Sequence, residues 1–424
     1  MKSITRRVGA RDHSARRSLS VAAPALPKAP PGGITGSGHS VPAPAEAAER
    51  KAVASHRLSP EASERIKLAS LVCSLLVCLG HAYLAPDPGA KANPGMSTVV
   101  FIEVAVKHGL ARVSTPFFFL IAAWMLTNAL VGTRGLGPLV DRSRYRAEIR
   151  KRVSSLLVPF AIWSGVSFAA LFIVQTLWPG LGLGALAPAS PAAFARLLFW
   201  DPVAYPLWFI RNLFLLSVVA PILVIVLSRR WLGLGALALM TVAWFSFSSA
   251  QTTRAVLFFS LGSYLALHPV RVARPGLVIR STLPVLWLVV AGVIAWSRLA
   301  MGGESGALRN AAVLLGLATL WWSMPIVSWM RHRSVQAMTG FTFFVYVFHE
   351  PLITFLRAIA KIHLTGNAAM HAATWLMVGI SAFAISVLVG RAWERWAPRS
   401  YAIVSGGRAP RQKSDQGVAV HRAA

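Results

Sequence analysis

Long apolar runs, separated by short polar or basic stretches, dominate the hydrophobic pattern of the 424-residue chain. Ten runs approach or exceed the roughly 20 residues that a helix needs to cross a bilayer. They cover residues 67–86, 113–132, 153–177, 205–227, 231–247, 255–270, 281–298, 310–330, 335–357 and 372–390. A backbone in lipid must satisfy its own hydrogen bonds, so each run is predicted to be a helix. The predicted fold class is all-α: a polytopic integral-membrane helical bundle with about ten transmembrane helices.

Two parts of the pattern are less regular. The sixth run is the weakest, because only sixteen uncharged residues separate Arg254 from Arg271 and Pro269 is one of them. Residues 98–111 are too few and too charged to cross a membrane. They are predicted to form an interfacial helix or a re-entrant segment on the outer side.

The two ends of the chain lack a sustained apolar period. Residues 1–64 are rich in Ala, Pro, Ser and Arg, and they contain no aromatic residue. Such a segment cannot bury enough apolar surface to become ordered. Residues 1–64 and 401–424 are therefore predicted to be disordered cytoplasmic tails, with a membrane domain at 65–400.

Composition supports the membrane assignment. Hydrophobic residues make up 55% of the chain and charged residues only 13%, about half the share typical of soluble domains. A soluble globular protein of this length would need more polar surface.

The net charge of +29 would also suit a nucleic-acid-binding protein. However, 33 of the 43 Lys and Arg residues fall in the tails and in alternate loops, on one side of a ten-helix arrangement. This bias follows the positive-inside rule. It predicts a bacterial-type inner (plasma) membrane protein with both termini cytoplasmic, contacts with membrane lipid, and no nucleic-acid partner.

Polar side chains within the apolar runs are rare, and each is a candidate functional residue. His81, Arg211, Asn212 and the pair His349–Glu350 all fall in the outer half of the predicted spans. Both His81 and His349 lie about 20 Å from the cytoplasmic start of their helices. Ser114 lies at the outer start of the second span, and Glu103 and His108 lie nearby in the segment 98–111.

These residue types can transfer an acyl group to a hydroxyl. A His removes the proton of the attacking alcohol, a carboxylate orients the His, and Arg or Asn stabilises the developing oxyanion. A transport pathway would use the same residue types. Trp208 is either an aromatic-belt residue or a substrate contact, and Arg150–Lys151–Arg152 either fixes topology or holds phosphates of a cytosolic donor. No metal site is predicted.

Several segments, taken in order, resemble the acyltransferase type 3 family of ten-span membrane proteins. The resemblance is carried by the segments CLGHAYL, TPFFFLIAAWML, KRVSSLLVPFAIWS, PLWFIRNLFLL, FTFFVYVFHEPLI and GRAWERWAP. The most specific are WFIRN and YVFHEP, and the match covers roughly residues 65–400.

The resemblance implies an acyltransferase that modifies polysaccharide, for example by O-acetylation, with acyl-CoA as donor substrate and no bound cofactor. It implies that His81 is the catalytic histidine, that Arg211 and the His349–Glu350 pair are site residues, and that Arg150, Lys151 and Arg152 contact the donor. The expected partners are an acyl donor and a glycan or sugar acceptor.

One position departs from the family pattern. A basic residue commonly stands eleven positions before the histidine, where this chain has Ser70. Lys67 lies one turn earlier on the same helical face and is a candidate replacement. Two other functions remain open from the sequence: a secondary transporter or flippase for a polar lipid or sugar, and a non-catalytic membrane scaffold.

Overall fold

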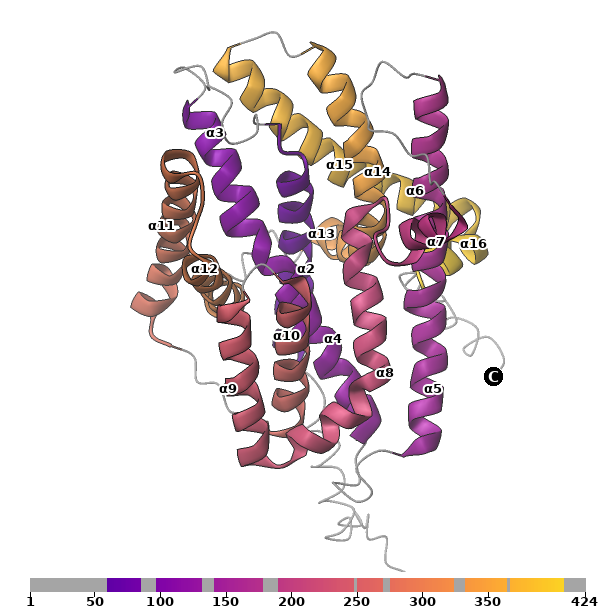
Figure 1. The fold of residues 1–424 in the computed structure, drawn as a ribbon, viewed down its shortest axis with the longest axis vertical. Coiled ribbons are helices and arrows are strands. Elements are labelled where there is room, and N and C mark those ends of the chain that lie inside the picture. The colour runs from indigo at the N-terminus through magenta and orange to yellow at the C-terminus, as the bar shows by residue number, and fades with distance from the viewer. Residues whose placement is uncertain are drawn as a thin grey trace, which may run out of the picture. The chain divides into compact units, whose positions relative to one another are not determined.

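The computed structural model describes residues 59–84, 97–131, 141–177, 190–247, 250–269, 275–323, 332–363 and 367–407. Every regular element in these ranges is helical (Figure 1). The N-terminal half contains α2 (Pro60–His81), α3 (Ser97–Val104), η2 (Ala105–Leu110), η3 (Ala111–Val113), α4 (Ser114–Val131), α5 (Arg142–Arg152), η4 (Val153–Leu157), α6 (Val158–Leu177), α7 (Pro191–Phe199), η6 (Tyr205–Leu207) and α8 (Trp208–Ser228). The C-terminal half contains α9 (Arg230–Ser246), α10 (Gln251–Leu267), α11 (Leu277–Met301), α12 (Gly306–Ala318), η7 (Thr319–Ser323), α13 (Arg333–Thr339), α14 (Thr342–His363), α15 (Ala368–Trp396) and α16 (Pro398–Val404).

The predicted all-α membrane fold is confirmed. Within the described residues, six helical stretches are long and apolar enough to cross a membrane: Thr98–Val131, Arg142–Leu177, Tyr205–Ser228, Leu277–Met301, Thr342–Ala360 and Ala368–Trp396. Each of the other four predicted runs also contains a helix, namely α2, α9, α10, and α12 with η7. These helices are shorter or begin with charged turns, so the count of ten spans stays a prediction.

The segment 98–111 differs from its prediction. It forms neither a separate interfacial helix nor a re-entrant loop, because α3, η2, η3 and α4 run on as one helical stretch to Val131. Its polar side chains Lys107 and His108 line a cavity between helices, as does Arg112, which follows the segment directly. The charges that argued against a membrane span are therefore accommodated inside the bundle.

The ordered bundle also extends past both predicted boundaries. Helix α2 starts at Pro60, where the Ser59 hydroxyl caps it by accepting from the Ala62 N–H at 3.1 Å. At the other end, α16 contains Tyr401, which is fully buried, and Trp163 Nε1 donates to the Val404 carbonyl at 3.0 Å. The rest of the predicted tails, residues 1–58 and 408–424, lies outside the described residues.

The ninth predicted run is divided in two. Residues 333–339 form the short helix α13, and the long helix α14 begins only at Thr342 after a turn at Gly340 and Phe341. As a result, α14 starts later along the chain than its apolar pattern predicts.

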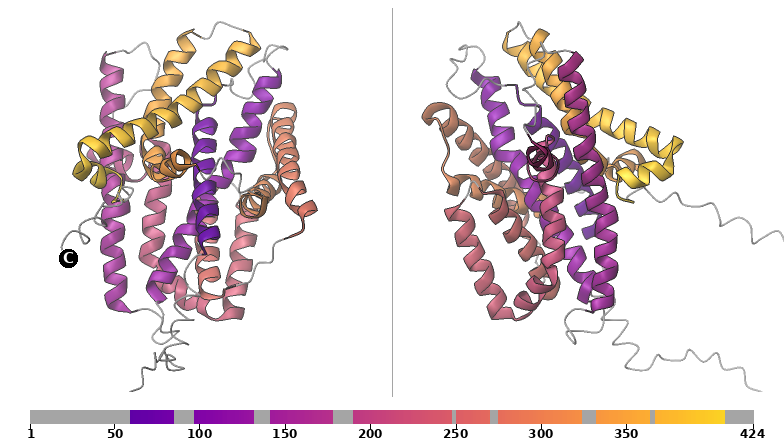
Figure 2. Two further views of the ribbon diagram at one scale, coloured as in Figure 1. Left: turned by 180° about the vertical axis from the view of Figure 1, so that it is seen from behind. Right: turned by 45° about the vertical axis from the view of Figure 1, so that its right-hand side comes forward.

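Helix α2 occupies an inner position, packed against α4, η2, α14 and α15 (Figure 2). Small residues permit these close approaches, as is common between membrane helices. A Cβ built on Gly80 of α2 would lie 3.0 Å from Ala111 Cβ, and one on Gly379 of α15 would lie 2.7 Å from Leu79 Cδ2. The end of α2 is therefore tightly enclosed.

Large apolar side chains cover the outer faces of the bundle. Examples are Ile222 (64% exposed), Leu239 (71%), Met377 (66%) and Leu388 (63%). Exposed apolar surface of this extent marks a contact with lipid or another apolar partner. The outer faces therefore fit a bilayer.

Helices α4 and α10 approach each other closely at Gly262. A Cβ on Gly262 of α10 would stand 2.1 Å from the Leu120 carbonyl oxygen of α4. We expect Gly262→Ala to destabilise the protein by about 1–3 kcal/mol, because the two backbones must separate. Thermal unfolding of the detergent-solubilised protein measures this. The matched control is Gly235→Ala in α9, where a Cβ meets nothing within 4 Å; equal midpoints for the two variants would contradict the packing.

Candidate active site

The C-terminal end of α2 carries His81, and two neighbouring helices, α3 and α15, hold it in place. Trp375 of α15 donates its indole N–H to the Leu79 carbonyl at 3.1 Å. Just beyond the helix, the Leu84 N–H donates to the Glu103 carboxylate of α3 at 3.1 Å. Glu103 in turn lies 2.8 Å from His371 Nε2 of α15. The residues on both sides of His81 are thus fixed by contacts to α3 and α15.

His81 faces a carboxylate from a remote part of the chain. Its Nδ1 lies 2.6 Å from Glu350 Oε2 of α14, which is hydrogen-bonding distance. Both side chains are largely enclosed, at 30% and 20% exposure. A carboxylate beside Nδ1 fixes the imidazole tautomer and stabilises the imidazolium, so Nε2 remains for proton transfer.

His349 lies behind this pair and is fully buried. Its Nδ1 is 2.8 Å from the Tyr346 carbonyl and 3.1 Å from the Val345 carbonyl. A carbonyl only accepts, so Nδ1 carries a proton, and the other ring nitrogen is Nε2. That Nε2 is 3.9 Å from Glu350 Oε2, and the ring stands edge-on to His81 with centroids 5.2 Å apart. His349 therefore supports the pair from within the protein and does not line the cavity.

A cavity of about 300 Å³ opens beside His81. Side chains from six regions converge on it: α2, the η2–η3 stretch, the start of α4, the η6–α8 junction, α10 and α14. Its lining residues are Val77, Gly80, His81, Lys107, His108, Ala111, Arg112, Thr115, Tyr205, Trp208, Arg254 and Arg357. This volume lies at the lower end of those typical for small-molecule sites.

Four cations on the cavity wall are absent from the site residues that the sequence predicts. They are Lys107, Arg112, Arg254 and Arg357. In the sequence they appear as span boundaries or as interfacial charges, with nothing to indicate a common location. The only available signal is that an Arg inside an apolar helix is costly and hence functional by default.

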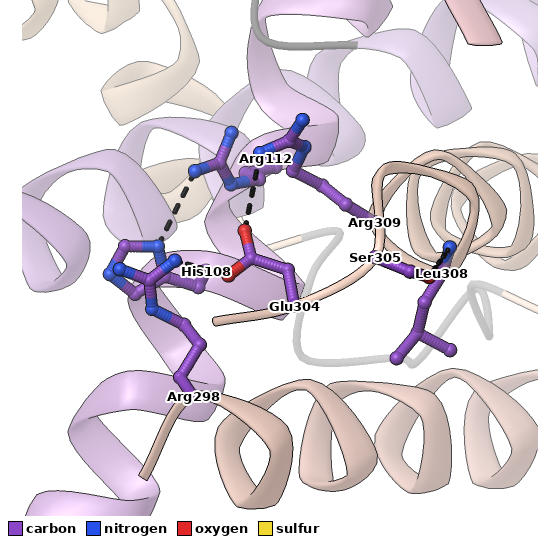
Figure 3. Close-up of polar contacts among 7 residues, drawn as sticks. All are labelled: His108, Arg112, Arg298, Glu304, Ser305, Leu308 and Arg309. Carbon is purple, nitrogen blue, oxygen red and sulfur yellow. Dashed lines mark hydrogen bonds and ion pairs between the residues drawn. The ribbon is translucent and has the colours of Figure 1, made fainter. Parts of the chain in front are cut away.

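Figure 3 shows a second charge cluster, which includes the cavity-lining residues His108 and Arg112. Glu304 pairs with Arg298 and, at 3.2 Å, with Arg309. His108 Nδ1 lies 3.3 Å from Arg112 Nη2. Glu304 is almost fully buried and provides the negative charge of this cluster.

Of the other residues predicted in the outer half of the spans, one lines the cavity and two do not. Trp208 lines the cavity, beneath the Arg254 guanidinium at 5.7 Å from the ring centroid. Arg211 instead reaches the end of α7, where it donates to the Phe199 carbonyl at 3.4 Å and to the Trp200 carbonyl, and Asn212 Oδ1 accepts from Arg211 Nε at 3.2 Å. Neither Arg211 nor Asn212 lines the cavity, and their predicted oxyanion role gains no support from this geometry.

Ser114 is also outside the cavity. It is fully buried and donates its hydroxyl to the Cys73 carbonyl at 3.1 Å, which ties α4 to α2. The neighbouring Thr115 lines the cavity instead. Of these two adjacent residues at the start of α4, Thr115 faces the cavity and Ser114 does not.

The predicted donor-side residues lie away from His81. Arg150 and Lys151 are exposed at the end of α5, and Arg152 is partly buried there. Lys67 is exposed on α2, fourteen residues and about 21 Å before His81. None of the four lines the cavity.

Three side chains could hold a metal ion. His81, His349 and Glu350 offer ligand atoms that all lie within 4.8 Å of one another. The 2.6 Å contact already joins two of these atoms directly. The arrangement equally forms a hydrogen-bonded acid–base pair, the role that the sequence predicts for these residues.

Comparison with known proteins identifies the class. A family model described as an acyltransferase domain (the acyltransferase 3 family) matches residues 66–391. The chain therefore belongs to this family and is a multi-pass membrane acyltransferase, as its sequence resemblance predicts.

One characterised relative extends the comparison. The chain is 26% identical over 328 residues to the succinoglycan biosynthesis protein ExoH of Rhizobium meliloti (strain 1021), covering 73% of this chain and 82% of that protein. No solved structure matches the chain.

The hydrogen bond from Trp375 to the Leu79 carbonyl holds the end of α2, and its contribution to stability and activity can be measured. We expect Trp375→Phe to lower stability by about 0.5–1.5 kcal/mol, because the Leu79 carbonyl loses its indole donor. The activity should fall as well, since the preceding residues position His81. The matched control is Trp396→Phe on the same helix, where the side chain is 81% exposed. Thermal unfolding and activity assays together test this; a neutral Trp375→Phe would show that the bond does not hold α2.

Proposed function

We propose that the protein is an O-acyltransferase that moves an acetyl or other short acyl group from cytoplasmic acyl-CoA to a hydroxyl of a saccharide or cell-surface glycan. The observation that carries the proposal is the 2.6 Å contact between His81 and Glu350 at the wall of a cavity, in a chain of the acyltransferase 3 family. In this proposal His81 is the general base and Glu350 its orienting carboxylate.

The reaction follows from this pairing. His81 Nε2 takes the proton of the acceptor hydroxyl, and the hydroxyl oxygen attacks the thioester carbonyl carbon. The new C–O bond forms, the C–S bond breaks, and the proton passes from the imidazolium to the leaving thiolate. Glu350 stabilises the transient imidazolium.

The glycan acceptor is supported by the relative. ExoH is named for the biosynthesis of succinoglycan, and it aligns with 73% of this chain. A cavity with a Trp and several cations also suits a polar sugar ring, because rings stack on aromatic faces while hydroxyls need polar partners.

The orientation in the membrane is part of the proposal. The basic loops predict cytoplasmic termini in an inner (plasma) membrane. Arg150, Lys151 and Arg152 would then lie on the donor side, with Lys67 on the same side of α2. Guanidinium and ammonium groups bind phosphates well, which fits the phosphate groups of acyl-CoA.

The decisive experiment supplies radiolabelled acyl-CoA and candidate glycans to the purified protein. We expect His81→Ala to reduce transfer of label to sugar by about 10²-fold or more, because the general base is lost. Glu350→Gln should reduce it less, since it removes only the orienting charge. The control is His332→Asn, which keeps the capping group at the start of α13.

Full activity in His81→Ala would refute the mechanism. Movement of the sugar across a vesicle membrane without any label transfer would point to a transporter instead.

The donor side has its own test. Arg150 is exposed at the end of α5, and we expect Arg150→Gln to raise the KM for acyl-CoA about tenfold with little change in kcat, because a charge-assisted contact to phosphate is lost. Arg146→Gln, exposed on the same helix, is the matched control. An unchanged KM for acyl-CoA would remove Arg150 from the donor site.

A further inference from the structure

Three arginines, Arg112, Arg254 and Arg357, line the cavity beside His81. No described carboxylate is among its lining residues. The nearest acid of known role, Glu350, is already in contact with His81 at 2.6 Å. Grouped cations within a membrane protein are costly unless an anion or water compensates them.

Two arginines near those of the cavity have their charge balanced by a buried carboxylate. Arg298 and Arg309 both pair with Glu304, close to the cavity-lining residues His108 and Arg112 (Figure 3). Within the described part of the chain, by contrast, neither Arg112 nor Arg254 has a carboxylate within the 4.0 Å of an ion pair.

Arg112 and Arg254 each have a neighbouring side chain, but some of their N–H donors have no hydrogen-bond partner among the described residues. Arg112 contacts the His108 ring nitrogen at 3.3 Å, and Arg254 lies over the Trp208 ring. Their Nε atoms, like that of Arg357, are buried and have no hydrogen-bond partner among the described residues. Arg357 follows Glu350 by seven residues on α14, so it lies on the same helical face as the catalytic carboxylate.

We propose that Arg112, Arg254 and Arg357 form an anion subsite that binds a carboxylate of the substrate beside His81. This deepens the proposed function and rests on it. The planar guanidinium fork matches a carboxylate in a bidentate geometry, whereas a neutral acetyl group or sugar hydroxyl leaves several donors unsatisfied.

Two substrates could supply such a carboxylate. One is a dicarboxylic acyl group, whose far end stays ionised while its near end is the thioester. The other is an acidic sugar in the acceptor, such as a uronate. Both fit a cavity of about 300 Å³ that adjoins the proposed general base.

The first experiment measures binding without turnover. Purified His81→Ala protein is titrated with succinate, glucuronate and acetate, with Trp208 beneath Arg254 contributing to the fluorescence signal. We expect saturable binding of succinate or glucuronate, weaker binding of acetate, and loss of binding when Arg254→Gln is added. Because His81→Ala has no general base, this result is independent of whether the transfer mechanism is correct.

The second experiment measures selectivity in the otherwise intact enzyme. For a dicarboxylic donor, Arg254→Gln should lower the kcat/KM ratio of succinyl-CoA to acetyl-CoA about tenfold or more. For an acidic acceptor, the donor ratio stays constant, and the preference for a uronate-containing glycan over a neutral one falls instead. Arg254→Lys should restore part of the preference, since it keeps the charge but loses the fork.

The matched control is Arg229→Gln, exposed at the end of α8 and outside the cavity lining. An equal loss for every donor and acceptor with Arg254→Gln would overturn the subsite, because the arginine would then serve the common thioester or the phosphates shared by all CoA donors. Failure of succinate and glucuronate to bind more tightly than acetate would overturn it as well.

Discussion

The contact between His81 and Glu350 depends on two helices that are remote in sequence meeting inside an apolar bundle. A histidine and a carboxylate are each costly to bury alone, and together they satisfy part of each other's requirement. Much of the surrounding packing can be understood as keeping them 2.6 Å apart. Trp375 and Glu103 fix the end of α2, while the carbonyls of Val345 and Tyr346 fix His349 behind Glu350.

Close packing through small residues makes this arrangement possible. Gly80 and Gly379 allow η3 and α15 to approach the end of α2, and Gly262 brings α10 against α4. Lipid provides little hydrophobic drive between helices, so such contacts and interhelical hydrogen bonds must provide the stability. The same approach carries Arg254 on α10 and Arg112 on η3 to one cavity wall. The close packing of these helices therefore also determines which charged side chains line the site.

Much of the site follows from single residues in the sequence. His81 and Glu350 stand out because polar groups in apolar helices are rare, and they contact each other at the site. Trp208, for which the sequence leaves an aromatic-belt role and a substrate contact open, lines the cavity. Arg211 and Ser114 stand out for the same reason, yet one contacts the end of α7 and the other the backbone of α2. Depth along a helix can be read from the sequence at 1.5 Å per residue, but the direction in which each side chain points cannot.

The sequence by itself determines the all-α membrane fold, because a bilayer imposes helix length and penalises isolated charge, and its motifs indicate the family. Only the tertiary structure decides which polar groups share a cavity. In the sequence, Lys107 looks like an interfacial charge in a segment too short to span, and Arg112 follows that segment directly. In the bundle, both line the cavity wall with Arg254 and Arg357. Their shared location results from contacts between helices far apart in the chain, for which local apolar periodicity carries no information.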